Sequence, residues 1–267
     1  MTRVETDDGT ELFIRDVGAG DPIVLVHGWP VDHRMFEYQY EGLLAAGYRC
    51  LGVDLRGFGK SDKPYGDYSY DRFADDLKSV FEAFDTENAT LAGFSMGGGV
   101  ATHYMSRHDE AHVDKLALIS AASPCLTEKS DFPEGLSDDD LKPFIEGVRN
   151  DRAAINAEFG ELLFHTRPSD GILNWLWGLG MEASGYATAK SGESLRDEDL
   201  RDELVDITVP TKVCHGVEDE VCPFEITGKV LDEGIENTDL VRFDECGHGT
   251  FYEEKENLTD EILDIAG

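Results

Sequence analysis

Short continuous runs of apolar residues recur along the chain, separated by segments with helical periodicity. An apolar run without polar alternation is typical of a strand buried on both faces of a parallel sheet. The clearest helical pattern is Tyr70–Phe84, where apolar residues recur at spacings of three and four. This alternation predicts an α/β fold, a mostly parallel sheet with helices on both faces. The expected strands are Pro22–Val26, Tyr48–Val53, Ala89–Ala92, Lys115–Ile119, Pro210–His215 and Asp239–Phe243. The other expected helices are Gly97–Arg107, Val221–Leu231 and Lys255–Ile265.

The alternation is interrupted between residues 123 and 205. This segment is helical in composition and rich in aromatic residues, and Ser137 precedes three aspartates as a helix N-cap would. We therefore expect a helical cap inserted at residues 123–205. Residues 1–122 and 206–267 are expected to form the α/β core.

Acidic residues dominate the composition, because 56 Asp and Glu against 23 Lys and Arg give a net charge of −33. Such a charge argues against a nucleic-acid partner and against attraction to an anionic membrane surface. The 40% of hydrophobic residues is nevertheless enough for a large core. Over a folded surface scaled from the mass, the acids lie roughly 14 Å apart, against a Debye length of about 10 Å at 0.1 M salt and about 3 Å at 1 M. The charge predicts a protein from a halophile, with a salt-rich cytoplasm.

Export and metal binding are not expected from the sequence. Residues 1–10 are polar and acidic, unlike a signal peptide, and no apolar run reaches about 18 residues. The five cysteines are odd in number and form no Cys-x-x-Cys pair. These features predict a cytoplasmic protein with free buried thiols and no metal site.

The strongest chemical signal is Gly93-Phe-Ser-Met-Gly97, which has the Gly-x-Ser-x-Gly pattern of a nucleophile elbow. An expected strand precedes it and a helix of small residues follows it. The glycines leave room for a sharp turn that exposes the Ser95 hydroxyl. The same turn directs the Met96 N–H toward developing negative charge. Ser95 is therefore the expected nucleophile.

A serine nucleophile needs a base, and the base needs an acid to orient it. His248 lies in a glycine-flanked loop after the last expected strand, where a base would reach the carboxyl edge of the sheet. Asp219 follows the strand ending at His215, with Glu218 and Glu220 as neighbouring acids. The order Ser95, Asp219, His248 is the α/β-hydrolase order.

The second oxyanion donor is expected after the first buried strand, in His27-Gly-Trp-Pro30. The Trp29 N–H is available, whereas Pro30 has none. We therefore expect Trp29 and Met96 to hold the oxyanion. His27 and His215, which end strands, are expected to hydrogen-bond to the backbone there.

Several motifs together resemble the cofactor-free haloperoxidase and aryl esterase (perhydrolase) branch of the α/β-hydrolase superfamily. The resemblance is dense over residues 22–122, resumes over 207–255 and is weak in the cap. The motifs are His27-Gly-Trp-Pro30, Gly47-Tyr-Arg49, Asp54-Leu-Arg-Gly-Phe-Gly-Lys-Ser-Asp-Lys-Pro64, Tyr70-Asp-Arg-Phe-Ala-Asp-Asp-Leu77, Gly93-Phe-Ser-Met-Gly-Gly-Gly99 and the segment from His215 to Pro223.

The resemblance implies hydrolysis of small carboxylic esters without a metal or other cofactor. It also implies perhydrolysis, in which hydrogen peroxide replaces water, a carboxylic acid becomes a peracid and the peracid oxidises halide. Perhydrolase-like members often carry a proline after the oxyanion residue, as Pro30 does here. A small-molecule ester is thus the expected partner, and homo-oligomerisation is left open.

Related activities remain as alternatives. Haloalkane dehalogenases and epoxide hydrolases resemble the first half of the chain but use Asp where this chain has Ser95. An enol-lactone or carbon–carbon bond hydrolase would keep the same three residues, and a non-catalytic binding member of the fold would not use them. A bulky apolar pocket is expected. Its candidate residues are Phe94, Pro30, Phe144, Phe164, Trp175 and Trp177.

Overall fold

A single twisted sheet organises residues 2–267, which the computed structural model describes. Eight strands formed by these residues follow the order β1-β2-β4-β3-β5-β6-β7-β8. Strand β2 pairs antiparallel with both β1 and β4, and all other pairs are parallel. The predicted α/β fold with a mostly parallel sheet is confirmed. The strands are β1 (Thr2–Glu5), β2 (Glu11–Gly18), β3 (Pro22–Val26), β4 (Arg49–Val53), β5 (Ala89–Phe94), β6 (Val113–Ile119), β7 (Thr211–Gly216) and β8 (Thr238–Phe243).

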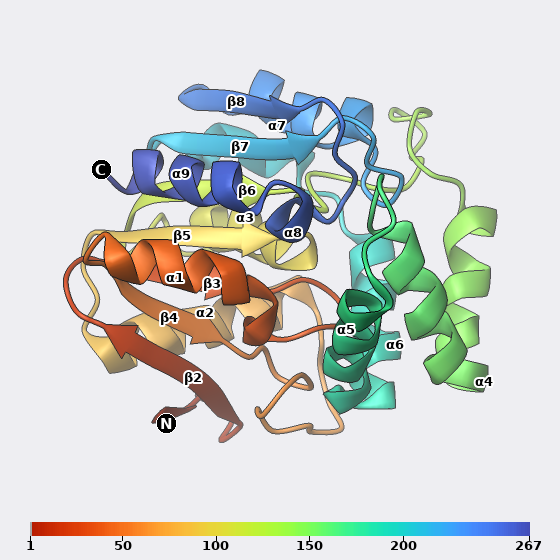
Figure 1. Ribbon diagram of the computed structural model, residues 1–267, viewed down its shortest axis with the longest axis horizontal. Helices are drawn as coiled ribbons and strands as arrows, with labels where there is room; N and C mark the ends of the chain where they lie inside the picture. Colours follow the sequence, from red (N-terminus) through yellow and green to blue (C-terminus); the bar gives the residue numbers. More distant parts are fainter. Residues whose placement is uncertain (1) are drawn as a thin grey trace.

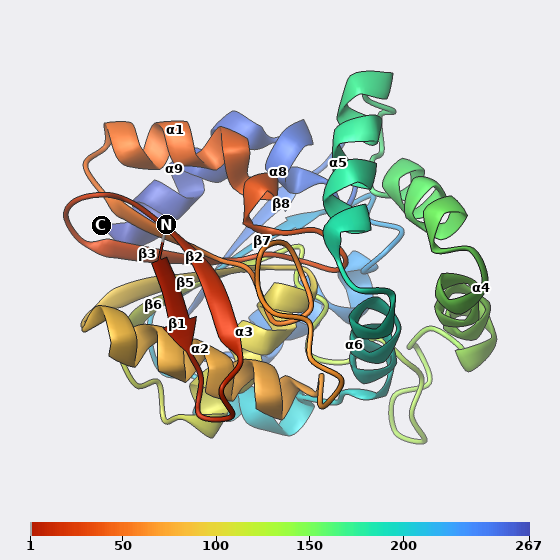
Figure 2. The ribbon, with the colours of Figure 1, turned by 90° about the horizontal axis from the view of Figure 1, so that it is seen from below.

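Helices cover both faces of the sheet. Helices α1 and α9 pack together on one face, and α2 and α3 pack together on the other (Figure 2). The helices outside residues 123–205 are α1 (Glu37–Ala45), α2 (Tyr70–Phe84), α3 (Met96–Arg107), α7 (Gly228–Gly234), α8 (Thr250–Glu253) and α9 (Lys255–Ala266). Three short 3-10 turns are η1 (His33–Phe36), η2 (Arg201–Asp206) and η3 (Phe224–Ile226).

Strand β5 lies at the centre of the sheet, and all six of its residues are buried. Burial on both faces explains why its sequence contains no charged residue. Helix α3 begins two residues after β5 and packs closely on it. The close approach needs small residues, because a Cβ on Gly98 would lie 2.5 Å from Cβ of Ala121. The predicted helix at Gly97–Arg107 is confirmed, and it begins one residue earlier.

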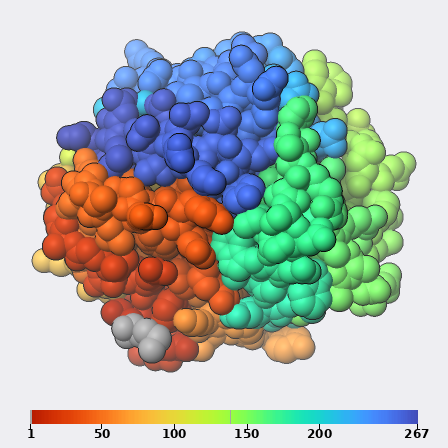
Figure 3. Space-filling view, in the orientation of Figure 1, coloured from red at the N-terminus to blue at the C-terminus, as the bar shows by residue number. Residues whose placement is uncertain are grey.

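Three further helices come from the segment that interrupts the alternation: α4 (Asp138–Leu162), α5 (Asp170–Glu182) and α6 (Gly185–Asp197). They lie beyond the carboxyl ends of the parallel strands (Figure 1). In the space-filling view the green residues of this segment form one end of the molecule and meet both the N-terminal and the C-terminal parts (Figure 3). Helix α4 begins at the predicted N-cap, where Ser137 and Asp140 form a capping box. A kink at Asp151 divides α4 into two parts.

The structure differs from the predicted elements at the N-terminus and before α7. Strands β1 and β2 and helix α1 were not expected, because their apolar residues do not form a long run or a strong helical pattern. The helix expected at Val221–Leu231 is wrong in its first half. Pro223 starts a 3-10 turn there, and the non-helical backbone of Thr227 separates that turn from α7.

The five cysteines are buried and free, as expected. Within residues 2–267, no helix has the length and apolar character needed to cross a membrane.

Candidate active site

Ser95 occupies the sharp turn between β5 and α3. Its φ of 53° and ψ of −122° lie in a region that a non-glycine residue rarely adopts. Two glycines make the turn possible: a Cβ on Gly93 would lie 2.4 Å from the Gly97 carbonyl oxygen, and one on Gly97 would lie 2.4 Å from that of Val26. The Ser95 N–H donates to the Ile119 carbonyl at 3.0 Å, which ties the turn to β6. The strain is therefore held by the surrounding backbone, and the side chain projects from the turn.

His248 and Asp219 form a buried hydrogen-bonded pair near this turn. The His248 Nδ1 lies 2.7 Å from Oδ2 of Asp219. The other carboxylate oxygen of Asp219 accepts the backbone N–H groups of Val221 at 2.9 Å and Cys222 at 2.8 Å. Since Oδ2 is an acceptor, Nδ1 carries the proton and Nε2 carries a free lone pair. The Nε2 atom is buried and makes no hydrogen bond within the described residues.

Electrostatics keep the Asp219 carboxylate ionised. Burial raises the pKa of Asp219, but the neighbouring His248 and His215 imidazoles outweigh burial and hold it well below the usual range. Glu218 and Glu220, the alternative acids, are exposed on the surface. Only Asp219 of these three has the burial and the contact that orienting a histidine requires.

Hydrogen bonds to Leu163 after α4 and to Glu253 on α8 hold the loop that carries His248. The Gly249 N–H donates to the Leu163 carbonyl at 2.6 Å, and Gly247 N–H donates to the Glu253 carboxylate at 2.8 Å. The Phe94 ring lies 4.9 Å from the His248 ring, measured between centroids. These contacts hold the His248 imidazole next to Phe94, the residue that precedes Ser95.

The loop after β3 brings Trp29 to the cavity that Ser95 lines. Its indole Nε1 donates to the Thr188 carbonyl on α6 at 2.8 Å, and its ring contacts Phe144 and Phe159 of α4. The peptide bond between Trp29 and Pro30 is cis. Among backbone hydrogen bonds outside the helices and strands of residues 2–267, none uses the N–H of Trp29 or Met96 as donor. Both N–H groups thus remain available for a substrate oxygen.

Ser95 opens into a cavity of about 280 Å³ that is also lined by residues of α4 and α6. Trp29 and Phe144, two of the predicted residues, line it. Its walls are otherwise mainly aliphatic, with two carboxylates and no Lys or Arg among the lining residues. The remaining lining residues are Leu126, Leu136, Asp140, Leu141, Ile145, Phe159, Leu162, Gly192, Leu195, Glu220, Val221 and Cys222.

The other pocket candidates lie elsewhere. Pro30 and Phe94 line an adjoining cavity of about 20 Å³ that shares Trp29 and Phe159 with the larger one. Phe164, contrary to the prediction, packs on Phe251 and Tyr252 beneath the His248 loop.

Trp175 and Trp177 also do not line the Ser95 cavity, contrary to the prediction. Trp175 contacts the ring of Tyr38 on α1. Trp177 is 39% exposed and donates to the Ala153 carbonyl. Helix α5 is apolar on several faces, so the spacing of its tryptophans could not show which side chain points inward.

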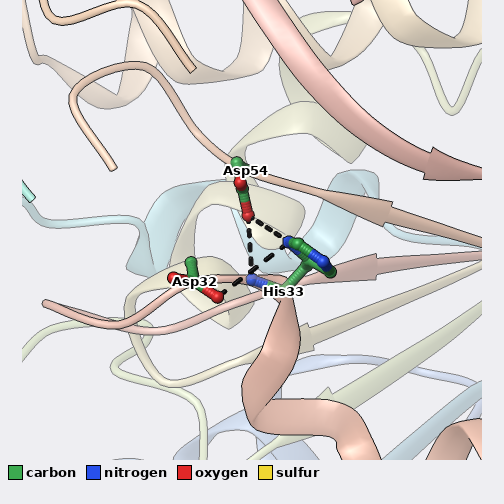
Figure 4. Close-up of side chains that lie close together, drawn as sticks. All are labelled: Asp32, His33 and Asp54. Atoms are coloured by element: carbon green, nitrogen blue, oxygen red, sulfur yellow. Dashed lines mark hydrogen bonds and ion pairs between the residues drawn. The ribbon is translucent and has the colours of Figure 1, made fainter. Parts of the chain in front are cut away.

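One buried cluster outside this site has donors of the kind that bind metals: Asp32, His33 and Asp54 (Figure 4). Its oxygens already have protein partners. Asp54 accepts from Nδ1 of His33 at 2.5 Å and from the Lys60 N–H at 2.8 Å. Both oxygens of Asp32 accept from the Arg34 guanidinium, at 2.9 and 2.6 Å. The cluster therefore ties the loop after β3 to the end of β4, and a cation there would meet the Arg34 charge.

Two site residues were not predicted. The Cys222 thiol lines the cavity within hydrogen-bonding reach of the Ser95 hydroxyl, and burial raises its pKa well above the usual value. His215 does hydrogen-bond to the backbone as expected, through Nε2 and the Cys222 carbonyl at 2.8 Å, but it also contacts Asp219. Both residues lie within four positions of Asp219 in the sequence, and this was the signal that could have predicted their place in the site.

The fold and this arrangement of a strained serine turn, a buried acid–histidine pair and an adjoining cavity define the α/β-hydrolase class. A family model described as the alpha/beta hydrolase fold matches residues 21–144. The chain is also 47% identical to the AB hydrolase superfamily protein YisY of Bacillus subtilis (strain 168), with 98% of each protein covered. The chain belongs to the α/β-hydrolase superfamily.

Two further relatives carry names that specify an activity. The bifunctional esterase/perhydrolase DCH of Acinetobacter calcoaceticus is 30% identical, with 98% of each protein covered. The solved structure of an esterase from Exiguobacterium antarcticum is 42% identical and superposes with a TM-score of 0.96 over 99% of this chain and 98% of that one. The similarity to these two proteins extends over 98% and 99% of this chain.

Proposed function

We propose that this protein is a serine esterase that cleaves small carboxylic esters through an acyl-enzyme. The observation that carries the proposal is the buried Asp219–His248 pair, whose 2.7 Å contact leaves His248 Nε2 unprotonated beside the Ser95 turn. A base of this kind is what a serine hydroxyl needs to become a nucleophile. The esterase and the esterase/perhydrolase relatives support the same reaction class.

The proposed reaction has two acyl transfers. Ser95 Oγ attacks the ester carbonyl while His248 Nε2 takes its proton, and the tetrahedral oxyanion accepts from the N–H groups of Trp29 and Met96. His248 then returns the proton to the leaving alcohol. Water repeats the sequence on the acyl-enzyme, which releases the acid and restores Ser95. Asp219 remains ionised and stabilises the transient imidazolium.

Perhydrolysis uses the same machinery with a different second nucleophile. If hydrogen peroxide attacks the acyl-enzyme, the O–H proton passes to His248 and the product is a peracid. The reaction draws on no cofactor, and the relative named as a bifunctional esterase/perhydrolase supports it as a side activity. We place this activity second to ester hydrolysis.

We further propose that residues 123–205 act as a cap that sets substrate size. The cavity of about 280 Å³ is closed by α4 and α6, and Phe144 on α4 packs on Trp29 at 5.2 Å between ring centroids. A cavity of this size suits a short acyl or small alkyl group.

A series of p-nitrophenyl esters tests both the reaction and the cap. The kcat/KM for the acetyl and butyryl esters is expected to be at least about tenfold higher than for the octanoyl ester, because the cavity has no room for the extra methylenes. Phe144→Ala should enlarge the cavity and reduce this preference by at least about threefold. Trp177→Ala, which removes an aromatic residue of α5 outside the cavity, is the matched control and should leave the ratio unchanged. No detectable turnover of any of these esters would contradict the proposed function.

The acidic surface predicts that folding depends on salt. Most of the 56 acids lie on an accessible surface of 10635 Å², so neighbouring carboxylates repel one another in dilute salt. At 10 mM salt the Debye length is about 30 Å, so each carboxylate repels many others on the surface. At 1 M salt the Debye length is about 3 Å, and this repulsion is screened. We expect native circular dichroism and activity in about 2 M salt and their loss after dialysis to about 10 mM. Retention of full activity in the dilute buffer would contradict a halophilic origin while leaving the esterase proposal intact.

A further inference from the structure

A second histidine contacts the carboxylate that orients His248. His215, near the end of β7, is fully buried, and its Nε2 lies 3.2 Å from Oδ2 of Asp219. That oxygen is the same one that lies 2.7 Å from Nδ1 of His248. Asp219 Oδ2 therefore sits between two imidazole rings.

The partners of His215 determine which of its nitrogens carries the proton. Its Nε2 faces two acceptors, the Asp219 carboxylate and the Cys222 carbonyl at 2.8 Å, so the proton must be on Nε2. The Thr227 hydroxyl, 3.4 Å from Nε2, donates instead to backbone carbonyls, that of Pro223 at 2.8 Å among them. His215 therefore donates to the Cys222 carbonyl and holds the N–H edge of its ring 3.2 Å from the Asp219 oxygen.

The other nitrogen of His215 has no partner. Nδ1 is buried without a hydrogen bond in the described residues, and a Cβ on Gly228 would lie 2.8 Å from it. A proton on Nδ1 would thus be a donor without a partner. A buried polar atom without a partner destabilises a fold, and an apolar side chain here would avoid that cost. The placement suggests a role beyond packing.

We propose that His215 is a positioning residue that acts on the reaction through Asp219. Oδ1 of Asp219 is held by two backbone N–H groups and Oδ2 by His248, and the His215 N–H lies against Oδ2 at 3.2 Å. The carboxylate cannot rotate away from His248 without breaking several of these bonds. The positive end of the His215 N–H dipole also stabilises the negative charge on Oδ2, which weakens the hold of Asp219 on a proton at His248. This inference rests on the proposed function of Ser95, His248 and Asp219.

The consequence is a specific change in activity when the donor is removed. His215→Leu is expected to lower kcat on p-nitrophenyl acetate by about 10- to 50-fold, in the range seen for loss of supporting hydrogen bonds, with KM changed less than about twofold. Its Asp219 carboxylate would hold the His248 proton more tightly. The acid limb of the kcat/KM profile should therefore move to higher pH, by about half a unit to one unit.

A donor-retaining variant separates positioning from packing. The amide nitrogen of glutamine is as many bonds from Cα as Nε2 of histidine, so His215→Gln should keep kcat within about threefold and leave the acid limb in place. His215→Met, which lacks a donor but is flexible enough to fill the space, replaces His215→Leu if the latter fails to fold. His108→Leu, at the far end of α3, is the control and should change neither quantity. Equal activity and equal pH profiles for the donor-free and glutamine variants would overturn the proposal.

Two measurements distinguish a failure of this proposal from a failure of the proposed function. In the Asp219→Asn background, His215→Leu should change the residual activity by less than about twofold, because the residue through which it acts is gone. The low-field proton resonance of the His248 Nδ1–H should shift in His215→Leu and return toward its native position in His215→Gln. That resonance needs no substrate, so an absence of ester turnover would contradict only the esterase assignment. An unchanged resonance in His215→Leu would contradict the link through Asp219.

Discussion

Replacing Ser95 with alanine is expected to reduce kcat on p-nitrophenyl acetate by about 10⁴- to 10⁶-fold. The substitution removes the nucleophilic oxygen and leaves the turn, the base and the oxyanion donors in place. The loss should appear in ester hydrolysis and in peracid formation alike, because both pass through the same acyl-enzyme. Residual hydrolysis would come from substrate positioning and the two N–H donors alone.

Two controls accompany the Ser95 substitution. Ser79→Ala, on the outer side of α2, removes a hydroxyl that donates only to the Asp75 carbonyl and should retain full activity. A fluorophosphonate probe should add one label to the native protein and to Ser79→Ala, and none to Ser95→Ala, as intact mass would show. Turnover by Ser95→Ala within about tenfold of the native rate would place the nucleophile elsewhere.

Asp219→Asn is expected to lower kcat by about 10⁴-fold, the size of the loss when a triad histidine is left in the wrong tautomer. The contacts of Asp219 explain why. Its Oδ1 accepts the N–H groups of Val221 and Cys222, so the asparagine carbonyl must occupy that position. The amide NH₂ would then face His248 Nδ1 and donate to it, which moves the histidine proton to Nε2. In that tautomer His248 cannot accept the proton of Ser95.

Glu218→Gln provides the matched control for Asp219. It alters an acid one residue away whose side chain is exposed. We expect wild-type kcat for this variant, and thermal melting should show that both variants remain folded. A loss in Glu218→Gln as large as that in Asp219→Asn would mean that the orienting acid has been misassigned.

The core of the fold was predictable because its strands are buried on both faces. Continuous apolar runs such as Pro22–Val26 need no tertiary information to be read as strands of a parallel sheet. The antiparallel β1–β2 hairpin at the sheet edge was not predictable in this way. Strand β1 has four residues, of which Val4 is buried, and the buried run of β2 is limited to Leu12, Phe13 and Ile14, so neither strand has a long apolar run.

The candidate catalytic residues were predictable because each lies at a strand end in a recognisable local setting. Gly93-Phe-Ser-Met-Gly97 can make the Ser95 turn only with glycine at the two close approaches, so five consecutive residues are enough to predict the candidate nucleophile. Asp219 follows β7 and His248 follows β8, and the carboxyl ends of parallel strands meet at the same edge of the sheet. The selection of Asp219 over Glu218 and Glu220 rested on spacing alone, and its burial became visible only in three dimensions.

The sequence by itself determined the α/β architecture and the three residues proposed for catalysis, because these depend on local backbone geometry and on the direction of parallel strands. Tertiary structure alone decided which cap side chains reach Ser95, since aromatic residues on an all-round apolar helix give no sign of their direction. It also decided that His215 shares the oxygen of Asp219 with His248. That contact depends on how the loop after β7 folds back on the strand end, and no periodicity or spacing along the chain encodes it.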